Sequence, residues 1–144
     1  MIVSKTPLRV PLAGGLSDLK GYADRFGGVT LSATIDKYIF VAVKKNLGSV
    51  YDLHYLNAYE KAVDVDSIRH DHIRESNKLC GVESPLDITI MNDLQHEGGL
   101  GSSGALTAGL LSALHGYAGE FPGPSRIVQE SSKIEMEVLE GASG

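Results

Sequence analysis

Residues 97–105 read Glu97-Gly98-Gly99-Leu100-Gly101-Ser102-Ser103-Gly104-Ala105. They follow a short apolar run and open a segment with helical periodicity. Glycines let backbone N–H groups approach an anion with no Cβ in the way, and the first turn of a helix adds unpaired N–H donors and the positive end of the dipole. The stretch predicts a cradle for a phosphate group, such as that of a nucleotide. The alternative is a tight turn with Ser102 or Ser103 as N-cap, and the stretch alone favours neither.

The helix after the glycines has two neighbouring faces, one of small residues and one apolar. The small residues are Ala105, Gly109, Ser112 and Gly116, and the apolar ones are Leu106, Leu110, Leu114 and Tyr117. Both sets recur at helical spacing. We therefore expect this helix to be buried on two sides, with its N-terminus at the bottom of a cleft.

Composition limits the class of protein. The chain has 144 residues, enough for one domain with a sizeable core, and 13 basic against 18 acidic residues give a net charge of −5. No run of Lys or Arg stands out, which argues against nucleic acid and favours a small-molecule partner. The single Cys80 cannot form an internal disulfide and is expected to pack in the core. No apolar run has the length of a membrane span or resembles a signal peptide, so we expect a cytoplasmic protein without a membrane partner.

The first half is predicted to be mostly sheet. Pro7 to Leu12 is an extended segment that carries Arg9 and leads into a glycine turn ending at Asp18. Further strands are predicted at Val29–Asp36, Tyr38–Lys44 and Val50–Leu56. We expect the last two to form an antiparallel meander with Asn46, Leu47 and Gly48 in its turn.

The second half alternates helix and strand. A helix is predicted from Asp66 to Cys80, stopped by Gly81, and a strand from Leu86 to Met91. His70 and His72 lie two apart on that helix and point in different directions, which argues against shared metal ligation. A Gly/Pro-rich linker then leads to a last helix with Ser125 as its N-cap.

Glu135 occupies an unusual position on that last helix. A helical wheel groups it with the core-facing residues Val128, Ser131, Val138 and Leu139. Acidic residues are rarely buried without a partner or a metal, so Glu135 is a functional candidate. The alternative is a rotation of the helix that lets Glu135 reach water.

Two known phosphate-binding motifs can be compared with the glycines. Gly99-x-Gly101-x-x-Gly104 matches the dinucleotide fingerprint of Rossmann oxidoreductases. In that motif the glycines follow a strand almost directly and a second strand follows the helix, whereas here seven residues intervene, 92–98, and another helix is predicted next. A Walker P-loop also fits poorly, since no Lys follows the glycines.

The residues resemble the GHMP kinases, named for galactokinase, homoserine kinase, mevalonate kinase and phosphomevalonate kinase. The first motif of that family resembles Thr6-Pro7-Leu8-Arg9-Val10-Pro11-Leu12-Ala13-Gly14-Gly15-Leu16-Ser17-Asp18, and the second resembles Gly99-Leu100-Gly101-Ser102-Ser103-Gly104-Ala105. Residues 27–38, Ile73-Arg74-Glu75 and Ile134-Glu135 are similar to the branch of D-glycero-D-manno-heptose 7-phosphate kinases.

The resemblance implies a fold and an activity. The fold is α+β, with a mixed, largely antiparallel sheet of about four to six strands and three helices on one face, as in the GHMP kinase N-terminal domain and the ribosomal protein S5 domain 2-like folds. The activity is phosphoryl transfer from ATP, with Mg²⁺, to a sugar or sugar phosphate.

The resemblance also assigns roles to residues. Ser103 and Glu135 would hold Mg²⁺, and Arg9 would be catalytic, facing the transferred phosphoryl group. Asp18, with Gly14 and Gly15, would bind the sugar. The nucleotide would be bound by Gly99, Leu100, Gly101, Ser102, Ser103 and Gly104.

Two departures from the family pattern carry expectations. Glu97 puts a negative charge where the family has Pro and Gly, which would weaken nucleotide binding unless the side chain points away or meets the metal. Family members are about twice as long, and their catalytic aspartate follows the Ser-Gly that matches Ser143-Gly144. We therefore expect residues 1–144 to be a partial N-terminal, ATP-binding domain without its C-terminal domain, inactive alone and associating with itself or with the missing half. A non-catalytic phosphate-binding or interaction module remains the alternative.

Overall fold

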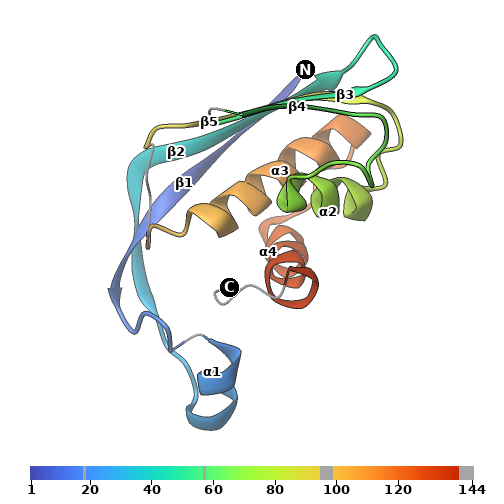
Figure 1. The fold of residues 1–144 in the computed structure, drawn as a ribbon. Coiled ribbons are helices and arrows are strands. Elements are labelled where there is room, and N and C mark those ends of the chain that lie inside the picture. Colours follow the sequence, from blue (N-terminus) through green and yellow to red (C-terminus); the bar gives the residue numbers. More distant parts are fainter. Residues whose placement is uncertain (18, 57, 95–98, 140–144) are drawn as a thin grey trace.

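A computed structural model describes residues 1–17, 19–56, 58–94 and 99–139. Five strands and four α-helices, followed by a π-helical turn, are defined in that part of the chain (Figure 1). In chain order they are β1 (Ile2–Ala13), α1 (Lys20–Phe26), β2 (Leu31–Lys45), β3 (Tyr51–Tyr55), β4 (Ala58–Ala62), α2 (Asp71–Cys80), β5 (Leu86–Asn92), α3 (Ser102–Ala118), α4 (Pro124–Ser132) and η1 (Lys133–Val138).

The five strands form one sheet in the order β1-β2-β5-β3-β4. Only β3 and β5 pair in parallel, so the expected mixed, largely antiparallel sheet is confirmed. The predicted meander is wrong, because β5 lies between β2 and β3, with Ile90 opposite both Val41 and Tyr55. The reason is burial: Leu86, Ile88 and Ile90 alternate inward along β5 and fill the centre of the core, which an edge strand could not do.

The two N-terminal strands extend beyond the sheet. β2 is one continuous strand, where two had been predicted at Val29–Asp36 and Tyr38–Lys44. Its residues from Leu31 to Tyr38 pair only with β1, whereas pairing with β5 begins at Ile39. The resulting two-stranded ribbon leads away from the body of the sheet to α1, at the far end of the molecule in Figure 1. Neither α1 nor β4 had been predicted.

The three helices α2, α3 and α4 lie on one side of the sheet, as expected: α3 packs against β1 and β2, and α4 packs on α3 without contacting a strand of the described residues (Figure 1). Two small residues of α3, Gly109 and Gly116, face β1, whereas Ser112, predicted on the same face, is exposed. The Ser4 hydroxyl donates to the Gly109 carbonyl at 2.7 Å, and a Cβ on Gly109 would lie 3.0 Å from Thr6 Oγ1. Leu110 and Leu114 are fully buried beside this face. The predicted two-sided burial of α3 is therefore confirmed.

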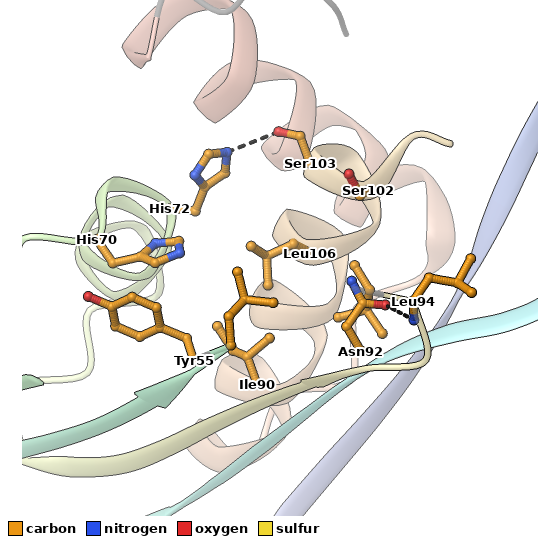
Figure 2. Close-up of a pocket in the computed structure, with 11 residues that line it drawn as sticks. Tyr55, His70, His72, Ile90, Asn92, Leu94, Ser102, Ser103 and Leu106 are labelled. Carbon is orange, nitrogen blue, oxygen red and sulfur yellow. Dashed lines mark hydrogen bonds between the residues drawn. The ribbon is translucent and has the colours of Figure 1, made fainter. Parts of the chain in front are cut away.

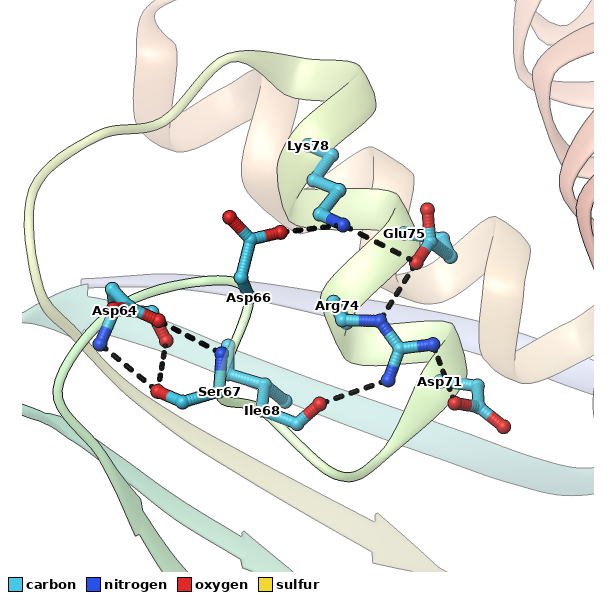
Figure 3. A network of polar contacts seen from close by, with 8 residues as sticks. All are labelled: Asp64, Asp66, Ser67, Ile68, Asp71, Arg74, Glu75 and Lys78. Atoms are coloured by element: carbon cyan, nitrogen blue, oxygen red, sulfur yellow. Dashed lines mark hydrogen bonds and ion pairs between the residues drawn. The ribbon is translucent and has the colours of Figure 1, made fainter.

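The helix predicted from Asp66 begins five residues later, at Asp71. Ser67 closes a tight turn by hydrogen bonds in both directions with Asp64, and this local side-chain bonding competes with a helix. Arg74 then ties the turn to α2, because it donates to the Ile68 carbonyl at 2.9 Å and contacts Asp71 at 2.6 Å (Figure 3). Gly81 ends the helix in the left-handed conformation, as predicted.

The last helix differs from its prediction in phase. It begins at Pro124 with Gly123, not Ser125, as N-cap, and after Ser132 it widens into the π-helical turn η1. A π-helical turn, with hydrogen bonds from i to i+5, holds more residues than an α-helical turn, and this changes the directions in which successive side chains point. In η1 the consecutive residues Ile134 and Glu135 are both buried. Val128 and Val138, predicted to face the core, are 63% and 46% exposed.

Candidate functional site

A cleft of about 640 Å³ lies between the β1–β2 ribbon and the start of α3. The residues that line it include Arg9 and Thr34 from the ribbon, Gly15 from the turn after β1, and Gly101 and Ser103 from the glycine stretch. The fold thus brings the two sequence motifs to opposite walls of one cleft. Of the glycine stretch, residues 97 and 98 lie outside the described residues.

The glycine loop contacts Arg9 in two ways: through a backbone hydrogen bond, and through close approach of the Arg9 side chain to the backbone of Gly101. The Arg9 amide donates to the Leu100 carbonyl at 3.0 Å, beside a break in the β1–β2 pairing between Pro7 and Arg9. A Cβ on Gly101 would lie only 2.8 Å from Arg9 Nε. The guanidinium is held in turn by Ser32, whose hydroxyl accepts from Arg9 Nη1 at 3.1 Å. A catalytic Arg candidate is therefore fixed at the mouth of the loop, and Ser32 is a positioning residue that the sequence did not reveal.

The first turn of α3 is open toward the cleft. Gly101, with φ of +66°, is the N-cap and provides no side-chain cap, so neither Ser102 nor Ser103 fills that role. The alternative in which a serine caps the helix is wrong. Helix geometry leaves the N–H groups of the first turn without intrahelical partners, and Ser102, Ser103 and Gly104 all line the cleft. This arrangement suits an anion.

Ser103 and Glu135 are in direct contact. The Ser103 hydroxyl donates to Glu135 Oε2 at 2.6 Å, and Thr107, one turn further along α3, donates to Oε1 at 2.5 Å. Glu135 is 5% exposed. The prediction that this acidic residue is buried among partners is therefore confirmed, and the alternative of a solvent-exposed Glu135 is wrong.

Glu135 stays charged despite its burial. Removal from water on its own raises the pKa of the carboxyl, but hydrogen bonds from His72, Ser103 and Thr107 outweigh this, and the pKa lies below its ordinary value. A charged carboxylate beside a hydroxyl is a pair of oxygen ligands of the kind that Mg²⁺ prefers. The residues present therefore fit the cation that the sequence resemblance implies.

His72 is the neighbour that sequence reasoning missed. Its Nε2 lies 3.0 Å from Ser103 Oγ (Figure 2) and 3.2 Å from Glu135 Oε1. The same ring nitrogen faces both partners, and Ser103 donates straight to the carboxylate, so the three do not form the relay that activates a serine nucleophile. The position of His72 in the sequence gave no sign of this contact, because the contact depends on how α2 packs against α3 and η1.

A second cavity, of about 280 Å³, lies on the other side of the α3 N-terminus. Ile39, Ile90, Leu94 and Leu106 give it apolar walls, and Figure 2 shows His70 facing it across from Asn92. Burial and the neighbouring His72 lower the pKa of His70, whose ring lies edge-on to Tyr55 with centroids 4.6 Å apart. Ser102 and Ser103 line both cavities, so they stand between an apolar pocket and a polar cleft.

The turn after β1 is closed by tight packing against the strand entry of β2. Gly14 has φ of +74°, and a Cβ there would collide with the Val29 carbonyl, while the Ser17 hydroxyl bridges Gly14 and Val29. Gly15 lines the cleft. Asp18, the expected sugar ligand, lies outside the described residues.

The described residues hold no cluster of three or more His, Cys, Asp or Glu side chains arranged around a metal. Within the same residues, no helix is long and apolar enough to cross a membrane. The dinucleotide fingerprint lacks its context, because α3 is followed by α4 instead of a strand.

Known proteins are similar to this chain both in sequence and in fold. Residues 62–144 match the family model of the GHMP kinases N terminal domain. The D-glycero-alpha-D-manno-heptose 7-phosphate kinase of Campylobacter jejuni is 30% identical over 149 residues, 96% of this chain and 44% of that protein. The mevalonate kinase of Methanothermobacter thermautotrophicus is 29% identical over 113 residues, 78% of this chain and 37% of that protein. The chain thus spans less than half the length of these curated relatives.

Solved structures agree. A D-glycero-D-manno-heptose 1-phosphate kinase from Bacteroides thetaiotaomicron superposes with a TM-score of 0.86 at 25% identity, covering 100% of this chain and 51% of that one. A mevalonate kinase from Methanococcus jannaschii shares the fold, with a TM-score of 0.77 at 20% identity over 99% of this chain and 48% of that one. The matched family model covers more than half of the chain, including the glycine loop and α3 on one wall of the cleft, and the chain belongs to the GHMP kinase family.

Proposed function

We propose that this chain provides the ATP- and Mg²⁺-binding part of a kinase that phosphorylates a sugar or sugar phosphate. The observation that carries the proposal is the contact between Ser103, directly behind the glycine loop, and the buried carboxylate of Glu135. The charged carboxylate can bind a cation, and a phosphate chain is attracted both by such a cation and by the helix N-terminus.

The two cavities divide the ligands between them. The smaller apolar cavity suits a nucleotide base, and the phosphates then cross the first turn of α3 at Ser102 and Ser103. In this arrangement the glycine loop residues Gly99, Gly101 and Gly104 bind phosphate oxygens through their N–H groups. The larger cleft, which Gly15 lines, receives the sugar, and Gly14 and Asp18 are proposed as sugar-binding residues because of the sequence resemblance.

The residues act by positioning and by neutralising charge. A bound Mg²⁺ would supply positive charge that offsets the negative charge of the phosphates. Ser103 and Glu135 hold that cation on the protein side, while Arg9, fixed by Ser32, faces the transferred phosphoryl group. The heptose-phosphate class of acceptor is favoured by the relative from Campylobacter jejuni, which matches 96% of the chain.

Titration calorimetry with a non-hydrolysable ATP analogue and Mg²⁺ tests the proposal. Ser103→Ala and Glu135→Gln should each weaken Mg²⁺-dependent binding by about tenfold or more, the scale of a lost ligand-site partner. Ser112→Ala and Glu137→Gln are matched controls, because both side chains are exposed and lie on the same two elements. The proposal fails if the nucleotide does not bind, or if the site variants bind it as tightly as the controls.

A separate proposal concerns turnover. Phosphoryl transfer to a hydroxyl uses a carboxylate that accepts its proton. Among the described residues that line the cleft, none carries a carboxylate. We propose that residues 1–144 form the N-terminal domain of a larger kinase and do not turn over alone. A coupled assay with ATP and a heptose phosphate should give no signal, and turnover that survives Asp18→Asn would overturn this.

The association expected from the sequence is also a proposal. Large apolar side chains are exposed around α1 and the end of the ribbon, among them Phe26 at 72% and Val29 at 83%. Such surface tends to be covered by a further domain or a second copy. Sedimentation that finds only monomers at high concentration would refute self-association. The non-catalytic module remains a second candidate, favoured if no nucleotide binds, and a cytoplasmic location remains an expectation.

A further inference from the structure

His72 brings a nitrogen ligand to the site where the proposed function puts Mg²⁺. Its side chain is 24% exposed, and it is the second residue of α2, while Ser103 is the second residue of α3 and Glu135 lies in η1. Three separate elements therefore bring ligand-type side chains to a common point. His70, its neighbour, packs against Tyr55 instead, with its ring centroid 5.8 Å from that of His72.

Four ligand-type atoms on these three residues are spaced like adjacent ligands in a coordination sphere. His72 Nε2 lies 3.0 Å from Ser103 Oγ and 3.2 Å from Glu135 Oε1, and Ser103 Oγ lies 2.6 Å from Glu135 Oε2. Ligands about 2.1 Å from a six-coordinate cation lie about 3.0 Å from each other when adjacent. A single cation can therefore contact all three residues after small side-chain shifts.

The hydrogen bonds show what the cation would replace. Ser103 uses its proton toward Glu135, so the two oxygens nearest His72 Nε2 are acceptors. In the metal-free protein Nε2 can therefore donate a hydrogen bond to them. A cation would be bound by the Nε2 lone pair of the tautomer that carries its proton on Nδ1.

We propose that His72 Nε2 is a third protein ligand of this site, so that the site favours Mn²⁺, Co²⁺ or Zn²⁺ over Mg²⁺. This inference rests on the proposed function only for the location of the cation. Imidazole suits the transition metals, whereas Mg²⁺ prefers oxygen ligands and dehydrates reluctantly. The carboxylate of Glu135 and the hydroxyl of Ser103 remain in the sphere, and phosphate oxygens fill the open positions.

Electron spin echo spectroscopy of bound Mn²⁺ tests this directly. Mn²⁺ is added to the 144-residue chain, first alone and then with the non-hydrolysable ATP analogue. A directly bonded imidazole gives modulation from nitrogen-14, which should disappear in His72→Gln and in protein labelled with nitrogen-15 histidine. His54→Gln is the matched control, since His54 is an exposed histidine on β3 that pairs with Asp52.

Metal affinity provides a second readout. In calorimetry, His72→Gln should weaken Mn²⁺ binding about tenfold or more, while Mg²⁺ binding changes by less than about threefold. The labelled wild-type protein keeps the test valid if His72→Gln fails to fold. The inference is overturned if Mn²⁺ does not bind, if the modulation is absent or survives nitrogen-15 labelling, or if His72→Gln weakens Mg²⁺ and Mn²⁺ equally. Failure of the proposed function looks different, because then Mn²⁺ still shows the histidine modulation but the nucleotide does not bind.

Discussion

Replacing Gly101 with alanine should separate two effects that meet at the start of α3. At φ of +66°, an alanine pays the steric penalty of the left-handed region, about 1–2 kcal/mol. Its Cβ would also lie 2.8 Å from Arg9 Nε and 2.9 Å from Arg9 Cγ, so the arginine must leave its rotamer, at about 1 kcal/mol more. We expect Gly101→Ala to lower the free energy of unfolding by about 2–3 kcal/mol.

Two other glycines of the same stretch are matched controls. Gly99 has φ of +81° with nothing within 4 Å of a Cβ, so Gly99→Ala carries the backbone penalty alone, about 1–2 kcal/mol. Gly104 is helical and also open, so Gly104→Ala should stabilise the protein by about 0.5–1 kcal/mol. Urea unfolding followed by circular dichroism measures all three. If Gly101→Ala costs no more than Gly99→Ala, Arg9 does not lie over the loop, and if Gly104→Ala destabilises, the start of α3 is misplaced.

Three further predictions concern titrating and buried groups. Burial raises the pKa of Glu60, but hydrogen bonds from the Arg69 amide and the Tyr55 hydroxyl outweigh it and hold the pKa below the ordinary 4.5. Because the folded pKa is depressed, this carboxylate stabilises the fold above about pH 4.5, and the stabilisation is lost as pH falls through the folded pKa. Urea unfolding at a series of pH values from about 6 to 3 should show this loss of stability. The loss should be smaller in Glu60→Gln. Tyr55→Phe should lower the free energy of unfolding by about 1.5–3 kcal/mol, because it removes a 2.8 Å hydrogen bond to Glu60. In the Glu60→Gln background the same substitution should have almost no effect, and equal effects in both backgrounds would refute the pairing. Burial raises the pKa of the Cys80 thiol to about 12, so a thiol reagent at about pH 8 should react slowly with native protein and fast in urea, and fast reaction of the native protein would contradict the packing.

Local chemistry was readable from the sequence, and long-range pairing was not. The helix that follows the glycine stretch, the burial of Glu135 and the stop of α2 at Gly81 all depend on residues close in sequence, and each was predicted. The insertion of β5 between β2 and β3 depends on which strand can fill the centre of the core, a choice that alternation within one segment cannot decide. His72 was missed for the same reason, because its contacts with Ser103 and Glu135 arise only when three helical elements pack. The phase of the last helix failed because a wheel with 100° per residue cannot foresee a π-helical turn.

The Arg9 amide belongs to strand β1, but it donates its hydrogen bond to the Leu100 carbonyl in the glycine loop. Its hydrogen exchange is therefore controlled by the loop and not by the sheet. Amide protons in the central ladder between β2 and β5 exchange with solvent only when the sheet itself opens, whereas the Arg9 proton exchanges whenever the glycine loop lifts. The ratio of the Arg9 exchange rate to that of an unprotected amide therefore gives the fraction of time the loop is open. A ligand that holds the loop closed should lower the exchange rate of the Arg9 amide and leave the exchange rates of the amides between β2 and β5 unchanged.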